Sequence, residues 1–436
     1  MIGTAARVGV FTESVIREMT RLAAEHDGVN LAQGFPDFPA PAELLEAAAR
    51  ALREGYNQYA ITWGAPNFRR ALAEKVRWFN GITVDPERNI TVTCGATEAM
   101  MATLLATVNA GEEVIIFEPF YENYGPDAKL SGAVPRFVPI RLEPGFPFDP
   151  DQVRAAVTPK TRAIVVNTPH NPTGKVFTRP ELEFIAELCH RHDLLAITDE
   201  VYEHIIYDGQ AHTTLASLPG MLERTVIVNS LSKSYSVTGW RVGWTIAPAA
   251  IADGIRKVHD FLTVGAAAPL QEAGVTALGF PRQYYTDLAA MYQRKRDTLL
   301  GILQEAGFAC LAPSGAYYII CDITPLGYDD DYEFTMHLIR EVGVAPVPGS
   351  SFFHDPASGR HYVRFAFPKR EETFDEVRRR LRRLRPRSRV TAAQPPAGTP
   401  NQIGADGKQR VPAPRASVPR PAASGPAGDR RGRPKR

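Results

Sequence analysis

Cysteine is scarce in this chain, and the few cysteines are far apart. The sequence contains four, namely Cys94, Cys189, Cys310 and Cys321. No two of them form a C-x-x-C pair, which argues against a disulfide framework and a zinc ribbon and indicates a reducing compartment. The spacing of His190 and His192 at a predicted helix end does not let their rings converge, so we expect no metal site.

Long apolar runs are also missing from the sequence. No stretch approaches the ~20 residues that a helix needs to cross a bilayer. Residues 1–13 lack the apolar segment of a secretory signal. We therefore expect a cytoplasmic protein that does not contact a membrane.

The C-terminal segment lacks the residues that build a core. Past Arg389 the sequence has no aromatic residue and no leucine, and it is rich in Pro, Gly, Ala and Arg. Residues 387–436 carry 11 Lys and Arg against 2 Asp and Glu, a charge of +9, whereas residues 1–386 carry 39 against 46, a charge of −7. Such a segment cannot bury enough apolar area to offset the entropy of ordering, so we predict a disordered basic tail. Without aromatics or a fold it could make only weak, salt-sensitive contact with nucleic acid, which we do not expect as a partner.

The body of the chain, in contrast, alternates strand and helix patterns from residue 89 onward. This alternation predicts a mainly parallel sheet in an α/β fold. Each of the five clearest strands is followed by Gly, an aromatic residue, Asn, Asp or Ser. Ligands of such sheets bind beyond the carboxyl ends of the strands, so we predict a site there. The predicted strands are Ile90–Cys94, Glu113–Phe117, Ala163–Asn167, Leu194–Thr198 and Thr225–Asn229.

The segment after the fifth strand contains a lysine in an unusual setting. Lys233 follows Ser230 by three residues and precedes Arg241 by eight. Partial burial and the guanidinium would both favour the neutral amine, which a Schiff base to an aldehyde requires. The arginine and the serine would suit a phosphate. An aldehyde that carries a phosphate is pyridoxal phosphate. The same Ser-x-x-Lys spacing opens the penicillin-binding and class A β-lactamase pattern, whose Ser-Asp-Asn and Lys-Thr-Gly tripeptides are absent.

A second cation lies in a predicted strand near the C-terminus. Within His361–Phe367, Arg364 interrupts an apolar run. An arginine stays charged wherever it is placed, so it needs an anionic partner there. The sequence leaves two hypotheses open, a structural salt bridge and a clamp for a substrate carboxylate.

Taken together, these segments resemble the fold-type I, pyridoxal-phosphate-dependent aminotransferases of class I/II. Within that family, the chain is most similar to the branch that contains kynurenine aminotransferase, which is also a cysteine-conjugate β-lyase, and the methionine aminotransferases. The similarity covers about residues 8–385. The motifs that carry it are NLAQGFPDFP, NQYA, CGATEAM, EPFYENY, NTPHNPTGKVF, ITDEVYEH, SLSKSYSVTGWRVGW and YVRFAF.

The resemblance implies a three-layer α/β sandwich around a mainly parallel seven-stranded sheet, with a smaller α+β domain. It implies four segments, which are an N-terminal arm with part of the small domain (1–45), a large cofactor-binding domain (46–280), the C-terminal small domain (281–386) and the tail (387–436). Family members are dimers, so we expect a homodimer in which the partner subunit's Tyr59 reaches the phosphate.

The resemblance also assigns roles in the site. Lys233 would hold the cofactor and move the substrate proton, Asp199 would pair with the pyridine nitrogen, and Tyr202 would hydrogen-bond the ring hydroxyl. The Asn171–Pro172 bond would be cis. Further cofactor contacts are implied for Gly95, Ala96, Thr97, Tyr121, Asn171, Ser230 and Arg241, and substrate contacts for Gly34, Asn171 and Arg364.

We therefore expect an aminotransferase that moves an amino group from an L-amino acid to a 2-oxo acid in a ping-pong cycle. Because no recognisable motif supplies a second arginine, we predict an apolar, aromatic-lined pocket and donors that are apolar, sulfur-containing or aromatic. Two alternatives remain, a cysteine-conjugate β-lyase and a pyridoxal-phosphate-binding regulator whose tail contacts nucleic acid. The residues expected in that pocket are Gly34, Phe35, Pro36, Asp37, Phe38, Tyr59, Tyr121, Tyr317 and Phe352.

Overall fold

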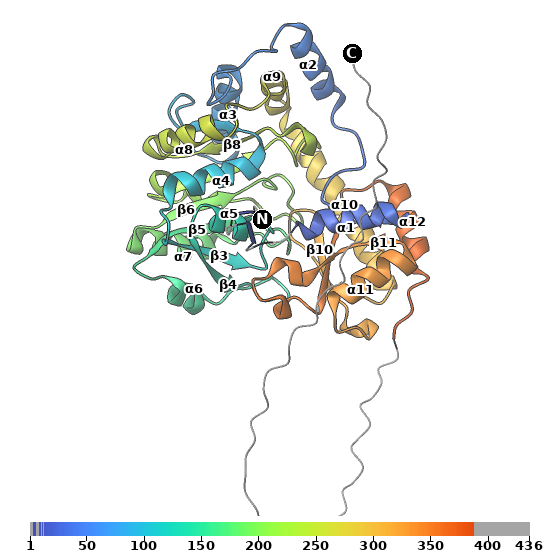
Figure 1. Ribbon diagram of the computed structural model, residues 1–436. Coiled ribbons are helices and arrows are strands. Elements are labelled where there is room, and N and C mark those ends of the chain that lie inside the picture. The colour runs from blue at the N-terminus through green and yellow to red at the C-terminus, as the bar shows by residue number, and fades with distance from the viewer. Residues whose placement is uncertain (1–2, 6–7, 10, 12, 388–436) are drawn as a thin grey trace, which may run out of the picture. The chain divides into compact units, whose positions relative to one another are not determined.

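The computed structural model describes residues 3–5, 8–9, 11 and 13–387. Residues 1–389 form one compact unit, and the description below concerns that unit (Figure 1). The disorder expected for 387–436 concerns residues outside the described ones, apart from Arg387. The Arg387 backbone N–H donates to the Leu326 carbonyl at 2.9 Å, and its guanidinium pairs with Glu333 at 2.8 Å. Among the helices of the described residues, none has the length and apolar character needed to cross a bilayer.

A seven-stranded sheet forms the centre of the larger part of this unit. Its order is β2-β8-β7-β6-β5-β3-β4. Only β8 runs antiparallel to its neighbours, which confirms the predicted mainly parallel sheet. The strands are β2 (Ile90–Thr93), β3 (Glu113–Glu118), β4 (Val134–Pro139), β5 (Thr161–Asn167), β6 (Leu195–Asp199), β7 (Thr225–Ser230) and β8 (Gly243–Ile246).

Two of these strands were not predicted from the sequence, for physical reasons. The strand β4 contains Pro135 and Pro139, which the edge of a sheet tolerates because no partner needs their missing N–H groups. The strand β8 is only four residues long and directly follows the lysine segment, so it lacks a periodic signal of its own.

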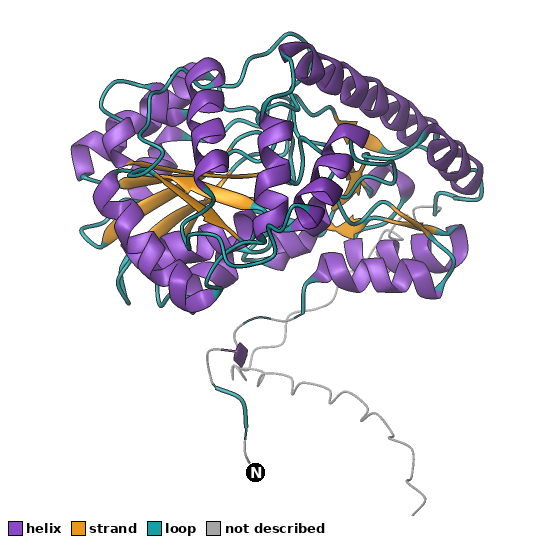
Figure 2. Cartoon of the chain, turned by 90° about the horizontal axis from the view of Figure 1, so that it is seen from above, coloured by secondary structure: helices purple, strands orange, loops and turns teal. Residues whose placement is uncertain are grey.

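Helices cover both faces of the sheet because successive strand residues point to opposite sides (Figure 2). Along β3, Ile116 joins the core under α4 and α8, whereas Ile115 joins the core under α7. This arrangement is the three-layer sandwich expected. The helices of this part are α2 (Ala42–Arg53), α3 (Pro66–Phe79), α4 (Gly95–Thr107), α5 (Tyr124–Leu130), α6 (Pro150–Ala156), α7 (Arg179–His192), α8 (Ala249–Leu262) and α9 (Ala268–Leu278).

The remaining residues build a smaller α+β layer from both ends of the described chain. A four-stranded antiparallel sheet has the order β12-β13-β10-β9, and β1 pairs with β11 in parallel. Met19 of α1 packs with Ile339 and Phe352, so the N-terminal helix lies beside C-terminal elements (Figure 1). The elements are α1 (Val15–Glu25), β1 (Val29–Asn30), α10 (Arg282–Glu305), β9 (Ala309–Leu311), β10 (Tyr318–Asp322), α11 (Asp331–His337), β11 (Val344–Ala345), β12 (Val347–Pro348), β13 (Tyr362–Ala366) and α12 (Glu371–Leu381).

Three X-Pro peptide bonds are cis, namely Glu118–Pro119, Thr168–Pro169 and Asn171–Pro172. The third confirms what the resemblance implied. All three follow β3 or β5, where the chain leaves the sheet.

Candidate active site

A cavity lies at the carboxyl edge of the sheet, where the five predicted strands end. The sequence predicted this location because parallel strands present their carboxyl ends on one edge. The cavity collects most of the predicted site residues, which are Gly34, Ala96, Thr97, Tyr121, Asn171, Asp199, Tyr202, Ser230, Lys233, Arg241 and Arg364.

Lys233 is a buried amine beside aromatic rings. Its Nζ lies 5.7 Å from the ring centroids of both Tyr202 and Tyr317. Burial and the neighbouring Arg241 guanidinium lower the pKa of Lys233 to about 8. The sequence predicted both effects. At neutral to mildly basic pH, a usable fraction of the amine is therefore unprotonated.

Asp199 is the buried acid of the cavity. The Tyr124 hydroxyl donates to Oδ2 at 2.6 Å, and the Val201 N–H donates to Oδ1 at 3.3 Å. Burial raises the pKa of Asp199, and no cation among the described residues forms an ion pair with it. A protonated ring nitrogen would supply that missing charge, so the site fits the pyridine ring of pyridoxal phosphate.

Tyr124 is a site residue that the sequence reasoning missed. It lies within the EPFYENY motif, but the resemblance assigned a role only to Tyr121. Tyr124 is the first residue of α5 and lines the cavity, so its hydroxyl can reach Asp199. The two tyrosine rings meet edge to face at 5.7 Å.

The start of α4 forms a cradle for an anion. The helix begins at Gly95. Gly95 has a φ of +83°, and a Cβ built on it would lie 2.3 Å from Arg241 Nη2. Only glycine allows the guanidinium to approach the first turn this closely. Backbone N–H groups, helix dipole and Arg241 together favour a phosphate here.

Arg364 is almost fully buried, with 1% of its surface exposed, but its partners are neutral. It donates from Nη1 to Asn171 Oδ1 at 2.8 Å and from Nη2 to the Ala32 carbonyl at 2.6 Å. Its Nε has no hydrogen-bond partner, and no described acid forms an ion pair with it. The structural salt-bridge hypothesis is therefore wrong. The geometry favours a clamp for an incoming carboxylate.

Two tyrosines organise the wall between Lys233 and Arg364. The hydroxyls of Tyr202 and Tyr318 share a hydrogen bond of 2.9 Å, and Arg364 lies 4.2 Å from the Tyr318 ring centroid. A Cβ on Gly34 would lie 2.2 Å from the Tyr318 hydroxyl, so this close approach requires glycine. Tyr318, which lines the cavity, was missed because its neighbour in the sequence, Tyr317, was chosen as the pocket residue.

The predicted aromatic lining is confirmed only in part, since Gly34 and Tyr121 line the cavity but most of the other expected residues do not. In addition, a second arginine, Arg17, belongs to the cavity wall. Phe38 packs against Tyr292 at 6.2 Å, and Phe35 lies over Lys369, so both point into the small layer instead. Phe352 and Tyr317 are buried behind the cavity wall, and Tyr59 is 86% exposed outside it. Polar side chains also line the cavity, namely Ser14, Arg17, Gln33, Glu122, Asn123 and Asp127.

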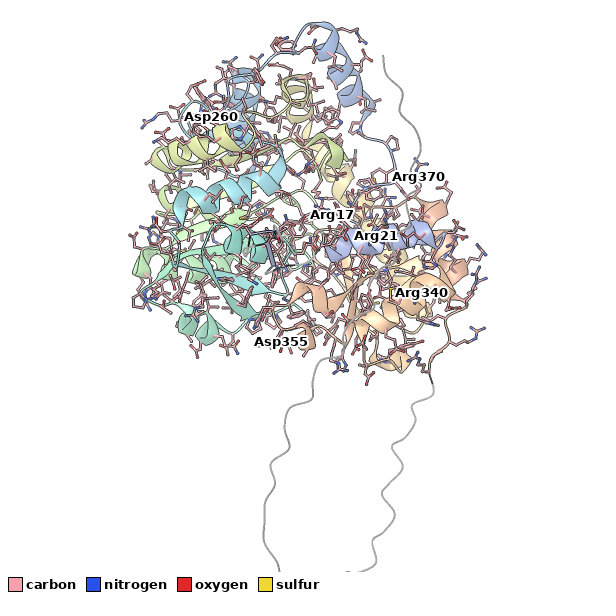
Figure 3. The ribbon with its side chains drawn as sticks, in the orientation of Figure 1. Arg17, Arg21, Asp260, Arg340, Asp355 and Arg370 are labelled. Carbon is pink, nitrogen blue, oxygen red and sulfur yellow. The ribbon has the colours of Figure 1, made fainter. Side chains whose placement is uncertain are left out.

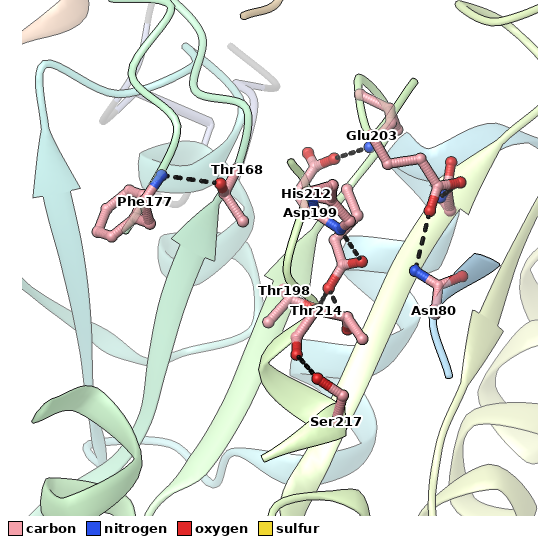
Figure 4. A network of polar contacts seen from close by, with 12 residues as sticks. Asn80, Thr168, Phe177, Thr198, Asp199, Glu203, His212, Thr214 and Ser217 are labelled. Atoms are coloured by element: carbon pink, nitrogen blue, oxygen red, sulfur yellow. Dashed lines mark hydrogen bonds and ion pairs between the residues drawn. The ribbon is translucent and has the colours of Figure 1, made fainter. Parts of the chain in front are cut away.

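A buried polar network supports the site from behind (Figure 4). Glu203 accepts from Lys75 and from Asn229, the latter at 2.7 Å, and Glu200 pairs with His212 at 2.8 Å. Ligand-type atoms of Glu200, Glu203 and His212 lie within 4.8 Å of one another, as in a metal site. However, the carboxylate oxygens already accept N–H and O–H donors, so we assign the network to holding the ends of β6 and β7.

Comparison with known proteins was consistent with this geometry. The sequence model of a family described as aminotransferase class I and II matches residues 26–381. The Mycobacterium tuberculosis protein named probable N-succinyldiaminopimelate aminotransferase DapC is 42% identical over 388 residues, covering 87% of this chain and 98% of that protein. A solved structure of N-succinyldiaminopimelate aminotransferase from Mycobacterium tuberculosis covers 87% of this chain and 99% of its own, with a TM-score of 0.85. The Escherichia coli methionine aminotransferase is 38% identical over 371 residues, covering 85% of this chain and 96% of that protein.

Proposed function

This chain belongs to the class I and II aminotransferases, and we propose that Lys233, Asp199 and Arg364 divide the chemistry of its site among them. As a member of that family, it is a pyridoxal-phosphate-dependent enzyme that moves an amino group from an amino acid to a 2-oxo acid. The proposal rests on one observation. The same cavity is lined by a lysine with a lowered pKa, a buried carboxyl group and an arginine that has no ion pair with any described residue.

The cofactor, when bound, supplies an electron sink for the charge that develops at the substrate Cα. Lys233 would hold its aldehyde, and the Lys233 amine would take and return the substrate Cα proton, which its pKa near 8 suits. Asp199 would keep the ring nitrogen protonated. Tyr202 and Asn171 would hydrogen-bond the ring hydroxyl, and Tyr121 would stack on the ring.

Two further groups complete this assignment. Gly95, Ala96, Thr97, Ser230 and Arg241 hold the phosphate at the start of α4. Arg364 orients the α-carboxylate with Asn171 and the backbone at Gly34, because its free Nε and its burial make it a strong anion clamp. Neither alternative, β-elimination or regulation through the tail, gains support from the relatives, which are named as aminotransferases.

We further propose a homodimer, on the basis of an apolar surface beside the phosphate cradle. Phe261 is 92% exposed and Tyr59 86% exposed, and Ile61 and Val264 extend the same surface. The two segments adjoin, because His259 Nε2 lies 2.9 Å from the Thr62 carbonyl. Covering this surface with a second copy would bring the partner subunit's Tyr59 toward the phosphate. Cytoplasmic placement is also a proposal, supported by four free cysteines.

The division into domains is proposed on the sheets. Residues 46–280 contain the whole seven-stranded sheet and would be the cofactor-binding domain. Residues 281–386 contain the four-stranded sheet and would form the small domain together with residues 1–45, whose α1 packs on them.

A substrate panel tests the proposed function. The purified protein, loaded with pyridoxal phosphate, should transfer amino groups to a 2-oxo acid from methionine, phenylalanine and kynurenine. We expect kcat/KM for these donors to exceed that for aspartate by about 10-fold or more. The tyrosines, Met100 and Ile16 of the cavity wall can bury an apolar side chain, which gains about 1.5–3 kcal/mol. Absence of turnover with every donor would refute the proposal, and a preference for aspartate would refute its donor class.

Gly95→Ala tests the phosphate cradle. The added Cβ would collide with Arg241 and hold a residue at a positive φ, which costs about 1–2 kcal/mol. We therefore expect about 10-fold weaker binding of pyridoxal phosphate, measured by fluorescence titration of the apoprotein.

The matched control is Gly301→Ala in α10, where a Cβ meets nothing within 4 Å. It should bind the cofactor normally and melt at the same or a slightly higher temperature, since alanine favours helix. Equal cofactor affinity in Gly95→Ala and the wild type would contradict the cradle.

A further inference from the structure

Arg17 lies in the first turn of α1 and lines the cavity. Figure 3 shows it on the half of α1 nearer the seven-stranded sheet, ahead of Arg21 along the helix. Two hydrogen bonds of the Ser14 hydroxyl hold this end of α1 in place. The Ser14 hydroxyl caps the helix by accepting from the Arg17 N–H at 3.3 Å and donates to Glu122, which follows β3.

The Arg17 guanidinium has no ion pair and no side-chain hydrogen bond with any described residue. Glu122, an acid of the cavity wall, accepts a hydrogen bond from Ser14 and forms no ion pair with Arg17. Arg21, one turn further along α1, forms ion pairs with Glu25 at 3.4 Å and with Glu13 at 4.0 Å. Unlike Arg17, it does not line the cavity.

An unpaired guanidinium that faces a substrate cavity presents donors to an anion, and a carboxylate matches its planar fork. Arg364 cannot serve two carboxylates, because it is buried and its Nη1 and Nη2 already donate to Asn171 and Ala32. Arg17 is exposed. The two cations thus line the same cavity, one of them buried and the other exposed.

We propose that Arg17 is a specificity-determining residue that binds a distal carboxylate on long-chain amino donors and 2-oxo acids. The inference rests on the proposed function, in which Arg364 takes the α-carboxylate. Because one cation is buried and the other is exposed, the side chain must be long. L-2-Aminoadipate has the required chemistry, whereas the carboxylate of aspartate is too close to its Cα to reach Arg17.

The test compares substrates of equal length that differ only in the distal group. For the loaded wild-type enzyme, kcat/KM should be higher for L-2-aminoadipate than for L-norleucine. In Arg17→Met, which keeps the length of the side chain and removes the charge, this ratio should fall by about 10–100-fold, the range of one charge-assisted pair. Arg17→Lys should recover part of it. Arg21→Met, the matched control on the same helix, should keep the wild-type ratio.

A binding measurement separates this inference from the proposed function. Adipate should bind the loaded wild type more tightly than hexanoate by calorimetry, and Arg17→Met should abolish that difference. If no donor were turned over but adipate kept its Arg17-dependent preference, the proposed function would fail and this inference would stand. Equal affinity for adipate in the wild type and Arg17→Met, or an equal fall of kcat/KM for aminoadipate and norleucine, would overturn it.

Discussion

Lys233→Ala is expected to lose at least about 10⁴-fold in kcat, the upper range that a positioned acid–base group contributes. The loss should be this large because one amine both holds the cofactor and moves the proton at Cα. In the wild type, borohydride reduction should fix pyridoxal phosphate to the peptide that contains residue 233.

A second lysine of lowered pKa serves as an internal control in this labelling experiment. Burial lowers the pKa of Lys369 to about 8, as it does for Lys233. Lys369 donates to the Phe35 carbonyl at 3.1 Å and does not line the cavity. If amine basicity alone decided the attachment, both lysines would carry the label. We expect it on Lys233 only, and recovery on Lys369 would contradict the assignment.

The pH dependence of cofactor uptake follows from the same pKa. A lowered lysine pKa means that the neutral form is about half of the amine at pH 8, predominates above that pH and declines below it. The rate at which the apoprotein takes up pyridoxal phosphate should therefore rise between about pH 7 and 9. An unperturbed lysine would still be mostly protonated across that range.

Asp199→Asn is expected to keep the cofactor but to lose about 10³-fold or more in kcat. An amide cannot hold the ring nitrogen in its protonated form, so the charge that develops at Cα loses its sink. Each tenfold loss corresponds to about 1.4 kcal/mol of barrier. Absorbance of the bound cofactor and single-turnover kinetics would separate retention from catalysis.

Tyr124→Phe provides a graded comparison for Asp199. It removes the 2.6 Å hydrogen bond to Oδ2 and leaves the carboxylate in place. A hydrogen bond to a charged group contributes about 1.5–3 kcal/mol, so we expect a loss of about 10–100-fold, smaller than that of Asp199→Asn. Wild-type turnover in Asp199→Asn, or an equal loss in both variants, would refute the assigned role of the carboxylate.

The sheet was predictable because its signals are local. Five strands were recognised from short apolar runs, and their ends were placed at one edge by the rule for parallel strands. The helix start near Gly95 was expected, and the resemblance placed Gly95, Ala96 and Thr97 in contact with the cofactor. Only the structure shows that Arg241, 146 positions later, packs against Gly95.

The side chains of the site also divide into those that local sequence identifies and those that only the fold places. Lys233 and Arg241 lie in one short segment, and Arg364 interrupts an apolar strand, so composition and spacing identified all three. Phe35 and Phe38, in contrast, lie in a loop whose direction local sequence does not encode. They pack against Lys369 and Tyr292 instead of lining the cavity.

The sequence by itself thus determined the family resemblance, the mainly parallel sheet and the lysine that we propose holds the cofactor, because each depends on residues that are neighbours along the chain. Only the tertiary structure decided that Tyr124 supports Asp199, that Arg364 has no acidic partner among the described residues, and that Arg17 lines the cavity. These three facts depend on contacts between distant segments. Whether a cation is neutralised or left free for a ligand depends on which acids folding brings within reach of it.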